Sequence, residues 1–431
     1  MGAPTIGDTE PYTFNKTRTT GNIITLLQAI PARLVHDNKT TSVKKVNLQT
    51  TAKNISKSQE VTRQTHPART TSQLKEPSVS LVKNTTTMLL QAKNFASQPH
   101  WKFEEDYTLS TSASETSCPV SVKIKALNSS WLKEKFLTKI TIFMDDRHFS
   151  DQDWIRLGHF IPPFGWMELN YNVVKEVVSV LPRIPDQQLL LAEKGEDNFP
   201  RCVSCAVVGN GGILKGSGLG KEIDEHDYVF RVNGAVIKTF EKDVGTRTSF
   251  YGFTAFTMLS SLYLLKNYGF NKIPQDKETK YILFTEGSRD YEWLKALQQN
   301  KEISGGTLES YRLRPRDDFG HSFDFKRLLV AHPDFSRYLK NRFLRSSILN
   351  GKYWNLYRPS TGALMLLTAL HLCDTVSAYG YMTQDFRKYP DHYYDKLKTN
   401  VTFYINHDFL LEKELWARLH NENIIKLYQR T

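Results

Sequence analysis

The stretch Cys205-Ala-Val-Val-Gly-Asn-Gly-Gly212 has the pattern of a short buried strand that runs directly into a glycine-rich turn. A second stretch, Arg358-Pro-Ser-Thr-Gly-Ala-Leu-Met-Leu-Leu-Thr-Ala-Leu-His-Leu-Cys373-Asp374, has the pattern of a small-residue turn that opens an apolar helix. Turns of this kind present backbone NH groups that suit an anionic ligand. The two stretches therefore predict two parts of an anion-binding site, and each part carries one cysteine.

Around these stretches, β-rich runs alternate with helical ones, which is typical of an α/β domain with a largely parallel sheet. Ligands of such sheets bind outside the carboxyl ends of the strands, where the glycine turn lies. A dinucleotide fingerprint is excluded because Leu214 stands where its third glycine should be. We expect strands at 205–208, 228–231, 281–285, 375–379 and 401–405, and helices at 254–268, 335–344, 362–372 and 409–428.

Composition divides the 431-residue chain into two parts. Residues 1–100 contain 25 Ser and Thr but only three aromatic residues, whereas residues 101–431 are rich in Trp, Tyr and Phe. A segment so poor in apolar side chains cannot form a core. We expect 1–100 to be a mostly disordered stem and 101–431 to be a single catalytic domain.

The net charge of +12 is also uneven, because residues 1–100 hold 13 Lys or Arg and 5 Asp or Glu, a net of +8, which leaves +4 for the rest. Nucleic-acid binding needs basic residues clustered on a folded face or interleaved with stacking aromatics, and no such stripe is present. We expect no nucleic-acid partner.

Asn-x-Ser/Thr tripeptides are concentrated in the Thr-rich stem, which suits a glycosylated segment in the secretory pathway. An unmodified polar linker is the alternative for any single site. The apolar run 23–30 is too short to span a bilayer, so the chain as written carries no anchor, and we interpret it as a fragment or variant. The six tripeptides begin at Asn15, Asn38, Asn54, Asn84, Asn128 and Asn400.

The four cysteines, Cys118, Cys202, Cys205 and Cys373, allow three disulfide connectivities, and spacing alone does not choose among them. A zinc ribbon needs a second close pair of cysteines besides Cys202 and Cys205, and the chain has none. Redox use of that pair is the other alternative.

The glycine-rich stretch continues through Tyr228-Val-Phe-Arg-Val-Asn233-Gly234 to Asp243-Val-Gly-Thr-Arg247, and in this length it resembles the large motif of animal sialyltransferases. The stretch from Arg358 to Tyr379 resembles their small motif. His392-Tyr393-Tyr394-Asp395 is similar to the third motif and His407-x4-Glu412 to the fourth, in the family's order. The chain is thus identified as a member of this family, for which a single GT-A-like domain with a Rossmann-like, largely parallel sheet is expected.

The resemblance implies a role for each motif. Asn210, Asn233, Tyr393 and the turn Ser360, Thr361 and Gly362 would bind the donor CMP-sialic acid. His407 would be the general base, because the N-terminus of the following helix favours a neutral ring. His392 would stabilise the leaving phosphate, and Glu412 would support the site, with a helix-surface carboxylate as its alternative. The family pairs Cys205 with Cys373, which leaves Cys118 with Cys202. Closing the longer loop would stabilise the fold by about 4 to 5 kcal/mol and would pin the glycine-rich turn beside the small-residue turn.

The implied reaction inverts the donor linkage and uses no cofactor and no metal. Asp151-Gln152-Asp153 matches the short D-x-D pattern with which other glycosyltransferases hold a divalent ion, and this is the competing interpretation. Several segments, such as Ser377-Ala-Tyr-Gly-Tyr381, are most similar to the N-acetylgalactosamine α-2,6-sialyltransferases, and the long stem favours their type 1 over type 2.

The expected acceptors are therefore O-glycoproteins that carry GalNAc on Ser or Thr, in the Golgi lumen, with membrane attachment only through an anchor that this chain lacks. Trp166, Tyr251 and Trp354 are candidates for sugar stacking, with a core position as the alternative for each. Two other functions stay open: a sialyltransferase of another linkage, such as α-2,3 to galactose, and a catalytically silent glycan-binding protein.

Overall fold

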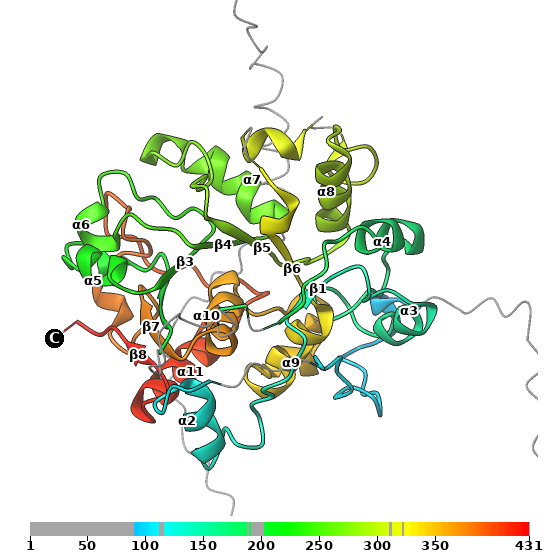
Figure 1. The fold of residues 1–431 in the computed structure, drawn as a ribbon, viewed down its shortest axis with the longest axis horizontal. Coiled ribbons are helices and arrows are strands. Elements are labelled where there is room, and N and C mark those ends of the chain that lie inside the picture. Colours follow the sequence, from blue (N-terminus) through cyan, green and yellow to red (C-terminus); the bar gives the residue numbers. More distant parts are fainter. Residues whose placement is uncertain are drawn as a thin grey trace, which may run out of the picture. The chain divides into compact units, whose positions relative to one another are not determined.

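The computed structural model describes residues 90–111, 116–187, 189–190, 202–309, 313–320 and 323–430. Within them the chain forms an eight-stranded sheet in the order β1-β6-β5-β4-β3-β2-β7-β8. All neighbouring strands are parallel except the edge strand β1, which pairs antiparallel with β6. The expected α/β class with a largely parallel sheet is confirmed, and Figure 1 shows the arrangement.

The strands are short, and helices connect most of them. The strands are β1 Phe143–Met144, β2 Ser204–Val208, β3 Tyr228–Val232, β4 Phe250–Phe253, β5 Lys280–Leu283, β6 Leu328–Ala331, β7 Thr375–Tyr379 and β8 Lys426–Leu427. The helices are α2 Val122–Asn128, α3 Asp151–Leu157, α4 Tyr171–Val178, α5 Gly220–Asp224, α6 Glu241–Val244, α7 Ala255–Leu264, α8 Ser288–Gln299, α9 Pro333–Arg342, α10 Thr361–Leu372 and α11 Phe409–Asn421.

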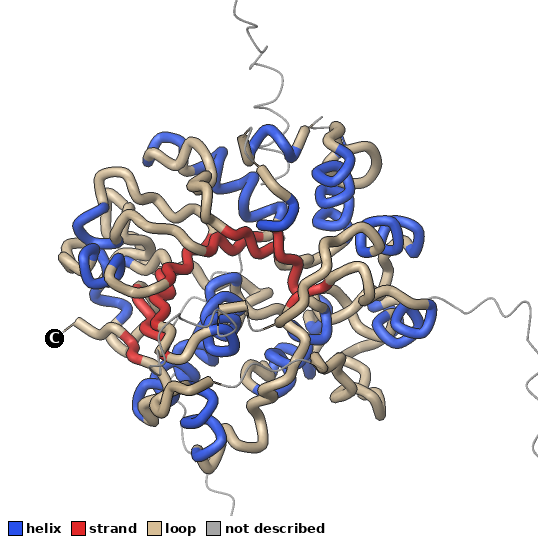
Figure 2. Tube along the Cα trace, viewed as in Figure 1, coloured by secondary structure: helices blue, strands red, loops and turns tan. Residues whose placement is uncertain are grey.

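Both faces of the sheet are covered, because alternate residues of a strand point to opposite faces. In β2, Cys205 and Val207 pack in one apolar cluster with α2, α9, α10 and α11. Ala206 and Val208 pack in the other, with α4, α7 and α8. Figure 2 shows the strands as an arc with α10 on its inner side and α7 and α8 outside it. A strand that is buried on both faces reads as a continuous apolar run, as β2 does.

Two of the sequence-based predictions are wrong. Residues 401–405 form a loop, because β8 rather than this segment pairs with β7. The helix expected at 409–428 ends at Asn421: Asn423 adopts φ 58°, a left-handed conformation that stops a helix, and the chain then enters β8.

Ordered packing begins before the expected domain boundary at residue 101. Phe95 lies in an aromatic cluster with Trp101 and Trp354, and the Trp354 indole NH donates to the Phe95 carbonyl oxygen at 3.1 Å. Ala92 NH donates to Glu168 Oε1 at 2.8 Å. Residues 90–100 therefore pack on the domain, through the side chains of Leu90, Ala92 and Phe95. Residues 1–89 lie outside the described part.

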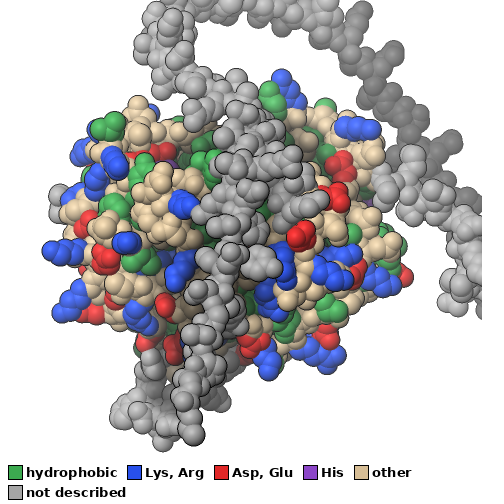
Figure 3. All heavy atoms as spheres, turned by 90° about the horizontal axis from the view of Figure 1, so that it is seen from above, with side chains coloured by type: hydrophobic (Ala, Val, Ile, Leu, Met, Phe, Trp, Pro, Cys, Tyr) green, Lys and Arg blue, Asp and Glu red, His purple; other side chains and the backbone are tan. Residues whose placement is uncertain are grey.

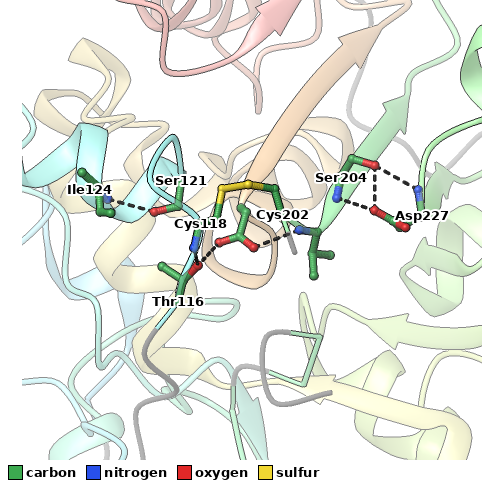
Figure 4. The surroundings of a disulfide bond; sticks show 9 residues. Thr116, Cys118, Ser121, Ile124, Cys202, Ser204 and Asp227 are labelled. Carbon is green, nitrogen blue, oxygen red and sulfur yellow. Dashed lines mark hydrogen bonds between the residues drawn. A yellow bond between two sulfur atoms is a disulfide. The ribbon is translucent and has the colours of Figure 1, made fainter. Parts of the chain in front are cut away.

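The structure pairs Cys118 with Cys202 and Cys205 with Cys373, as the family resemblance implied. Figure 4 shows the first bond, with Thr116 beside it. Asp374 accepts hydrogen bonds from Thr116 and from the Val203 backbone NH, which joins the start of β2 to the start of β7.

The second bond joins the beginning of β2 to the C-terminal end of α10. The turns at Gly209 and Ser360 lie at the other ends of those elements, about 13 Å along the strand and about 18 Å along the helix. The expectation that this disulfide pins the two turns beside each other is therefore wrong. The bond holds together the ends of β2 and α10 that lie away from the two turns.

Candidate active site

Because the strands are parallel, their carboxyl ends, and the motifs that follow them, lie at one edge of the sheet. From β2 the chain adds β3 to β6 on one side, and β7 returns on the other side of β2. Such a reversal of strand order opens a crevice at the carboxyl ends of the two strands. Gly209 follows β2 and Gly380 follows β7, so the glycine turn lies at this switch point.

Two backbone hydrogen bonds hold the glycine turn against the end of β7. Gly209 NH donates to Tyr379 O at 2.8 Å, and Gly211 NH donates to Gly380 O at 3.0 Å. A Cβ at Gly211 would lie 2.5 Å from that same carbonyl oxygen, and one at Gly212 would lie 2.0 Å from Pro390 O. Only glycine permits three backbone segments to approach so closely.

His392 and Tyr393 come to the same turn from the third segment. His392 forms an isolated antiparallel bridge with Gly211, and Tyr393 NH donates to Asn210 O at 3.0 Å. The His392 side chain is 40% exposed, and its Nδ1 lies 3.6 Å from Asp395 Oδ2. Its ring stacks on that of Tyr394, with centroids 5.0 Å apart. This leaves an accessible ring, backed by a carboxylate, beside the glycine turn.

The Tyr393 hydroxyl donates to Val236 O at 2.7 Å, and the ring is fully buried. The Tyr393 side chain thus supports the glycine turn from the interior of the domain. Its contact with a nucleotide stays a prediction.

Asn210 and Asn233 follow the neighbouring strands β2 and β3. Asn210 Nδ2 donates to Val232 O at 3.4 Å, which ties the two strand ends together. Asn233 adopts φ 50°, a left-handed conformation that Asn tolerates better than most residues. The Oδ1 atoms of both side chains are buried, and neither has a hydrogen-bond partner among the described residues. A buried acceptor without a donor costs about 1–3 kcal/mol, so both atoms suit a ligand that brings donors.

The small-residue turn is the N-terminus of α10. Ser360 is the N-cap, and its Oγ accepts from Ala363 NH at 3.0 Å. Thr361 and Gly362 begin the helix, where NH groups have no intrahelical acceptor and the helix dipole favours an anion. Tyr381, which follows β7, donates its hydroxyl to Gly362 O at 2.8 Å and so fixes the turn against the sheet.

Glu412 contacts the small turn rather than His407. Its Oε1 accepts from Ser360 NH at 2.8 Å and its Oε2 from Ser360 Oγ at 2.7 Å. The side chain is 5% exposed, and burial, with the nearby charge of Asp408, raises the pKa of Glu412 to about 7. The structure therefore gives this residue a supporting role in the turn.

His407 is half-buried before α11, whose N-cap is Asp408. Its Nδ1 lies 2.9 Å from Arg358 O, and its Nε2 lies 3.2 Å from Asn406 Nδ2. A proton on Nδ1 is the one that Arg358 O can accept, which leaves the Nε2 lone pair to take a proton. Burial and the Arg358 charge lower the pKa of His407 to about 4, so the ring is neutral near pH 7.

The three aromatic candidates for sugar stacking lie in the core, since Trp166, Tyr251 and Trp354 are at most 3% exposed. The sequence-based search missed the aromatic residues of the 401–407 loop instead. Phe403 and Tyr404 are each 43% exposed, within a few residues of His407. The signal available in the sequence was the pair of adjacent aromatic residues just before His407, in the segment 401–405 that we expected to be a strand.

The remaining predicted sites lie on the surface or outside the described residues. Asn128 and Asn400 are exposed, whereas the tripeptides at Asn15, Asn38, Asn54 and Asn84 and the apolar run 23–30 fall in residues that the structure does not describe. Among the described residues no helix is long and apolar enough to cross a membrane. On the uncovered part of the face in Figure 3, basic, acidic and apolar side chains are interspersed.

The D-x-D segment begins α3. Asp153 accepts from Ser150 Oγ at 2.6 Å and pairs with Arg156 at 3.3 Å. Among the described residues, no group of three or more His, Cys, Asp or Glu side chains is arranged so that it could hold a metal ion.

Comparison with known proteins gives consistent matches. The chain is 59% identical over 342 residues to alpha-N-acetylgalactosaminide alpha-2,6-sialyltransferase 1 of Gallus gallus and 55% identical over 341 residues to that of Homo sapiens, each alignment covering 79% of this chain. It spans 60% and 57% of the length of those two relatives. The human type 2 enzyme is 46% identical over 64% of this chain and 73% of its own length.

The fold is similar to that of a mammalian sialyltransferase crystal structure, with a TM-score of 0.52 and 25% identity over 73% of this chain and 99% of that one. A second crystal structure of a mammalian sialyltransferase, in complex with Gal-beta-1-3GalNAc-ortho-nitrophenol, matches with the same TM-score over 74% of this chain and 100% of that one. The model of glycosyltransferase family 29 (sialyltransferase) matches residues 143–424. Since that match covers strands β1 to β7, helix α11 and all four motifs, the chain belongs to glycosyltransferase family 29, the sialyltransferases.

Proposed function

We propose that this protein transfers sialic acid from CMP-sialic acid to O-6 of GalNAc that is α-linked to Ser or Thr, in the Golgi lumen, without a metal or other cofactor. The relatives that are 54–59% identical are named for transfer to N-acetylgalactosaminides with α-2,6 linkage. The observation that carries the proposal is the meeting of the glycine turn, the small turn, His392 and the segment before α11 at one edge of the sheet.

The donor would lie across the switch point. Asn210 and Asn233 offer Oδ1 acceptors, which have no partner within the described part of the chain, to the hydroxyl and amino groups of cytidine. The NH groups at the start of α10 and the His392 ring would hold the phosphate. As the bond from the sugar C2 to the phosphate oxygen breaks, the leaving CMP gains negative charge, which these donors stabilise.

His407 would act as the base. The O-6 hydroxyl of GalNAc would displace the Asn406 amide at Nε2 and give its proton to that nitrogen while its oxygen bonds to C2 of sialic acid. Attack from the face opposite to CMP inverts the β-linkage of the donor into an α-sialoside. A neutral ring at working pH suits this step, and the lowered pKa of His407 provides it.

The acceptor would approach over the 401–407 loop. Phe403 and Tyr404 are exposed there, and aromatic faces bind the apolar faces of sugar rings and peptide groups. The loop is thus our candidate for contact with the glycopeptide.

The test is incubation with CMP-sialic acid and a GalNAc-Thr peptide, followed by linkage analysis of the product by NMR. We expect an α-2,6-sialoside that forms equally in EDTA. A product on galactose instead would favour the α-2,3 alternative, to which relatives at 27% identity belong by name. Glycopeptide binding without transfer would favour the silent binding protein, and recovery only with manganese would overturn metal independence.

A further inference from the structure

Arg358 is joined both to the segment that holds His407 and to a distant turn of the sheet. Its backbone NH donates to Asn406 O at 2.9 Å, and its carbonyl oxygen lies 2.9 Å from His407 Nδ1. Its guanidinium Nε lies 3.0 Å from Glu286 Oε1. The backbone of Arg358 thus positions the imidazole, while its side chain pairs with Glu286.

Glu286 lies in the turn between β5 and α8. Its side chain is 6% exposed. Its backbone NH donates to Asp290 Oδ2 at 2.9 Å, and the other oxygen of Asp290 accepts from Ala255 NH at 2.8 Å. A buried carboxylate on a turn held in this way is a fixed partner for Arg358, whose side chain is 25% exposed. Such a partly buried pair interacts more strongly than a fully exposed one.

The charged groups near His407 each have hydrogen-bond or ion-pair partners of their own. Asp408 caps α11 through Leu411 NH and accepts from Ser346 Oγ. Glu412 is occupied by Ser360. Arg358 carries the nearby positive charge and, after burial, is the cause that lowers the pKa of His407. Glu286 is joined to His407 through Arg358, whose side chain pairs with Glu286 and whose carbonyl oxygen contacts the imidazole.

We propose that the Arg358–Glu286 ion pair controls how readily His407 accepts a proton, with Arg358 and Glu286 as positioning residues of opposite effect. This inference deepens the proposed function and rests on it, because it takes His407 as the base. The guanidinium repels a proton on the imidazole and keeps the ring neutral. The Glu286 carboxylate offsets part of that repulsion, so the ring can still accept the proton of the acceptor hydroxyl.

The test compares Arg358→Met with Glu286→Gln. Both changes are made in side chains, so the backbone contacts of Arg358 with His407 stay available. Removing the guanidinium should raise the pKa of His407 by about one unit, and removing the carboxylate should lower it. The Arg358→Lys variant keeps the charge and should restore the parent value, and the double variant should lie between the two single ones.

The readout is the ring titration of His407 by NMR of histidine-labelled protein, with His407→Ala to assign its signal. The acid limb of kcat/KM should move with the titration. Because the titration needs no turnover, it decides this inference even if the parent protein fails to transfer sialic acid, which would overturn only the proposed function. Shifts in the same direction, or none, would contradict the ion-pair role. If Arg358→Met does not fold, the downward shift in Glu286→Gln remains the deciding result.

Discussion

Both carboxylate oxygens of Glu412 accept hydrogen bonds from Ser360, one from its backbone NH at 2.8 Å and one from its hydroxyl at 2.7 Å. The two residues belong to different motifs, and this contact fixes the N-terminus of α11 to that of α10. Glu412→Gln keeps a group of the same shape and can keep both contacts, whereas Glu412→Ala leaves Ser360 without its partner. We expect the Ala variant to lose about 2–3 kcal/mol of unfolding free energy and the Gln variant less than about 1 kcal/mol, measured by denaturant titration.

The pH dependence of stability gives a second test of Glu412. Its pKa is raised to about 7 in the folded chain, from the usual 4.5, so folding favours the protonated form. The resulting stabilisation is complete below about pH 4.5 and is lost as the pH rises through 7. We expect Glu412→Gln to gain in Tm relative to the parent between pH 5 and pH 8. A constant difference between the two across that range would contradict the raised pKa.

His407 has the opposite linkage. Its pKa falls to about 4 from 6.5, so the unfolded chain binds a proton first and stability is lost as the pH drops from 6.5 toward 4. His407→Gln should remove this part of the acid sensitivity. In activity, the variant should lower kcat by about 10²–10⁴-fold, the usual range for loss of a general base. An acid limb of kcat/KM near pH 6.5 in the parent would contradict a neutral, low-pKa base.

Asn233 offers a matched pair of variants for nucleotide binding. Asn233→Gly accepts the φ of 50° and removes the amide, whereas Asn233→Ala removes the same amide and adds strain of about 1 kcal/mol. Since Oδ1 has no partner among the described residues, the Gly variant should keep its Tm. Calorimetry should show weaker CMP binding in both variants, by roughly tenfold for one lost hydrogen bond. Unchanged CMP affinity in the Gly variant would remove Asn233 from the donor site.

The Cys205–Cys373 bond should act on stability more than on substrate binding. It closes a loop with a sequence separation of 168 and lies at the ends of β2 and α10 that are remote from the turns. Replacing both cysteines with Ala should lower the unfolding free energy by about 2–5 kcal/mol. At a temperature where the variant is folded, KM for CMP-sialic acid should stay within about twofold of the parent. A large rise in KM there would mean that the bond reaches the turns after all.

Phe403 and Tyr404 should affect the acceptor and not the donor. We expect the double Ala variant to raise KM for a GalNAc-Thr peptide several-fold while KM for CMP-sialic acid stays constant, since each exposed aromatic contact is worth about 1 kcal/mol. Leu264→Ala is the control, because this leucine is 55% exposed on α7. Equal effects of the loop and control variants would exclude the loop as an acceptor surface.

Several parts of the fold followed from the chain itself. The strands β2, β3 and β5 and the helix α10 were predicted because each is a largely apolar run bounded by turn residues, and β7 because it holds residues that favour strands, such as Thr375, Val376 and Tyr379. The strands β4, β5 and β6 each have four residues, and an apolar run that short is ambiguous between strand and helix; of the three, only β5 was predicted. Residues 401–405 have the pattern of a strand, but β8 occupies the position beside β7. The local sequence pattern does not show which of two segments pairs with a given strand.

The sequence by itself determined the family, the class of the fold and the residues of the motifs. Glycines, cysteines and the small-residue turn form local patterns that can be recognised without knowledge of distant contacts. Tertiary structure alone decided that Glu412 binds Ser360, that Arg358 pairs with Glu286, and that the Cys205–Cys373 bond lies away from the turns. Each of these is a contact between residues far apart in the chain. Such contacts depend on the order of the strands and the direction of the helices, and the local sequence pattern determines neither.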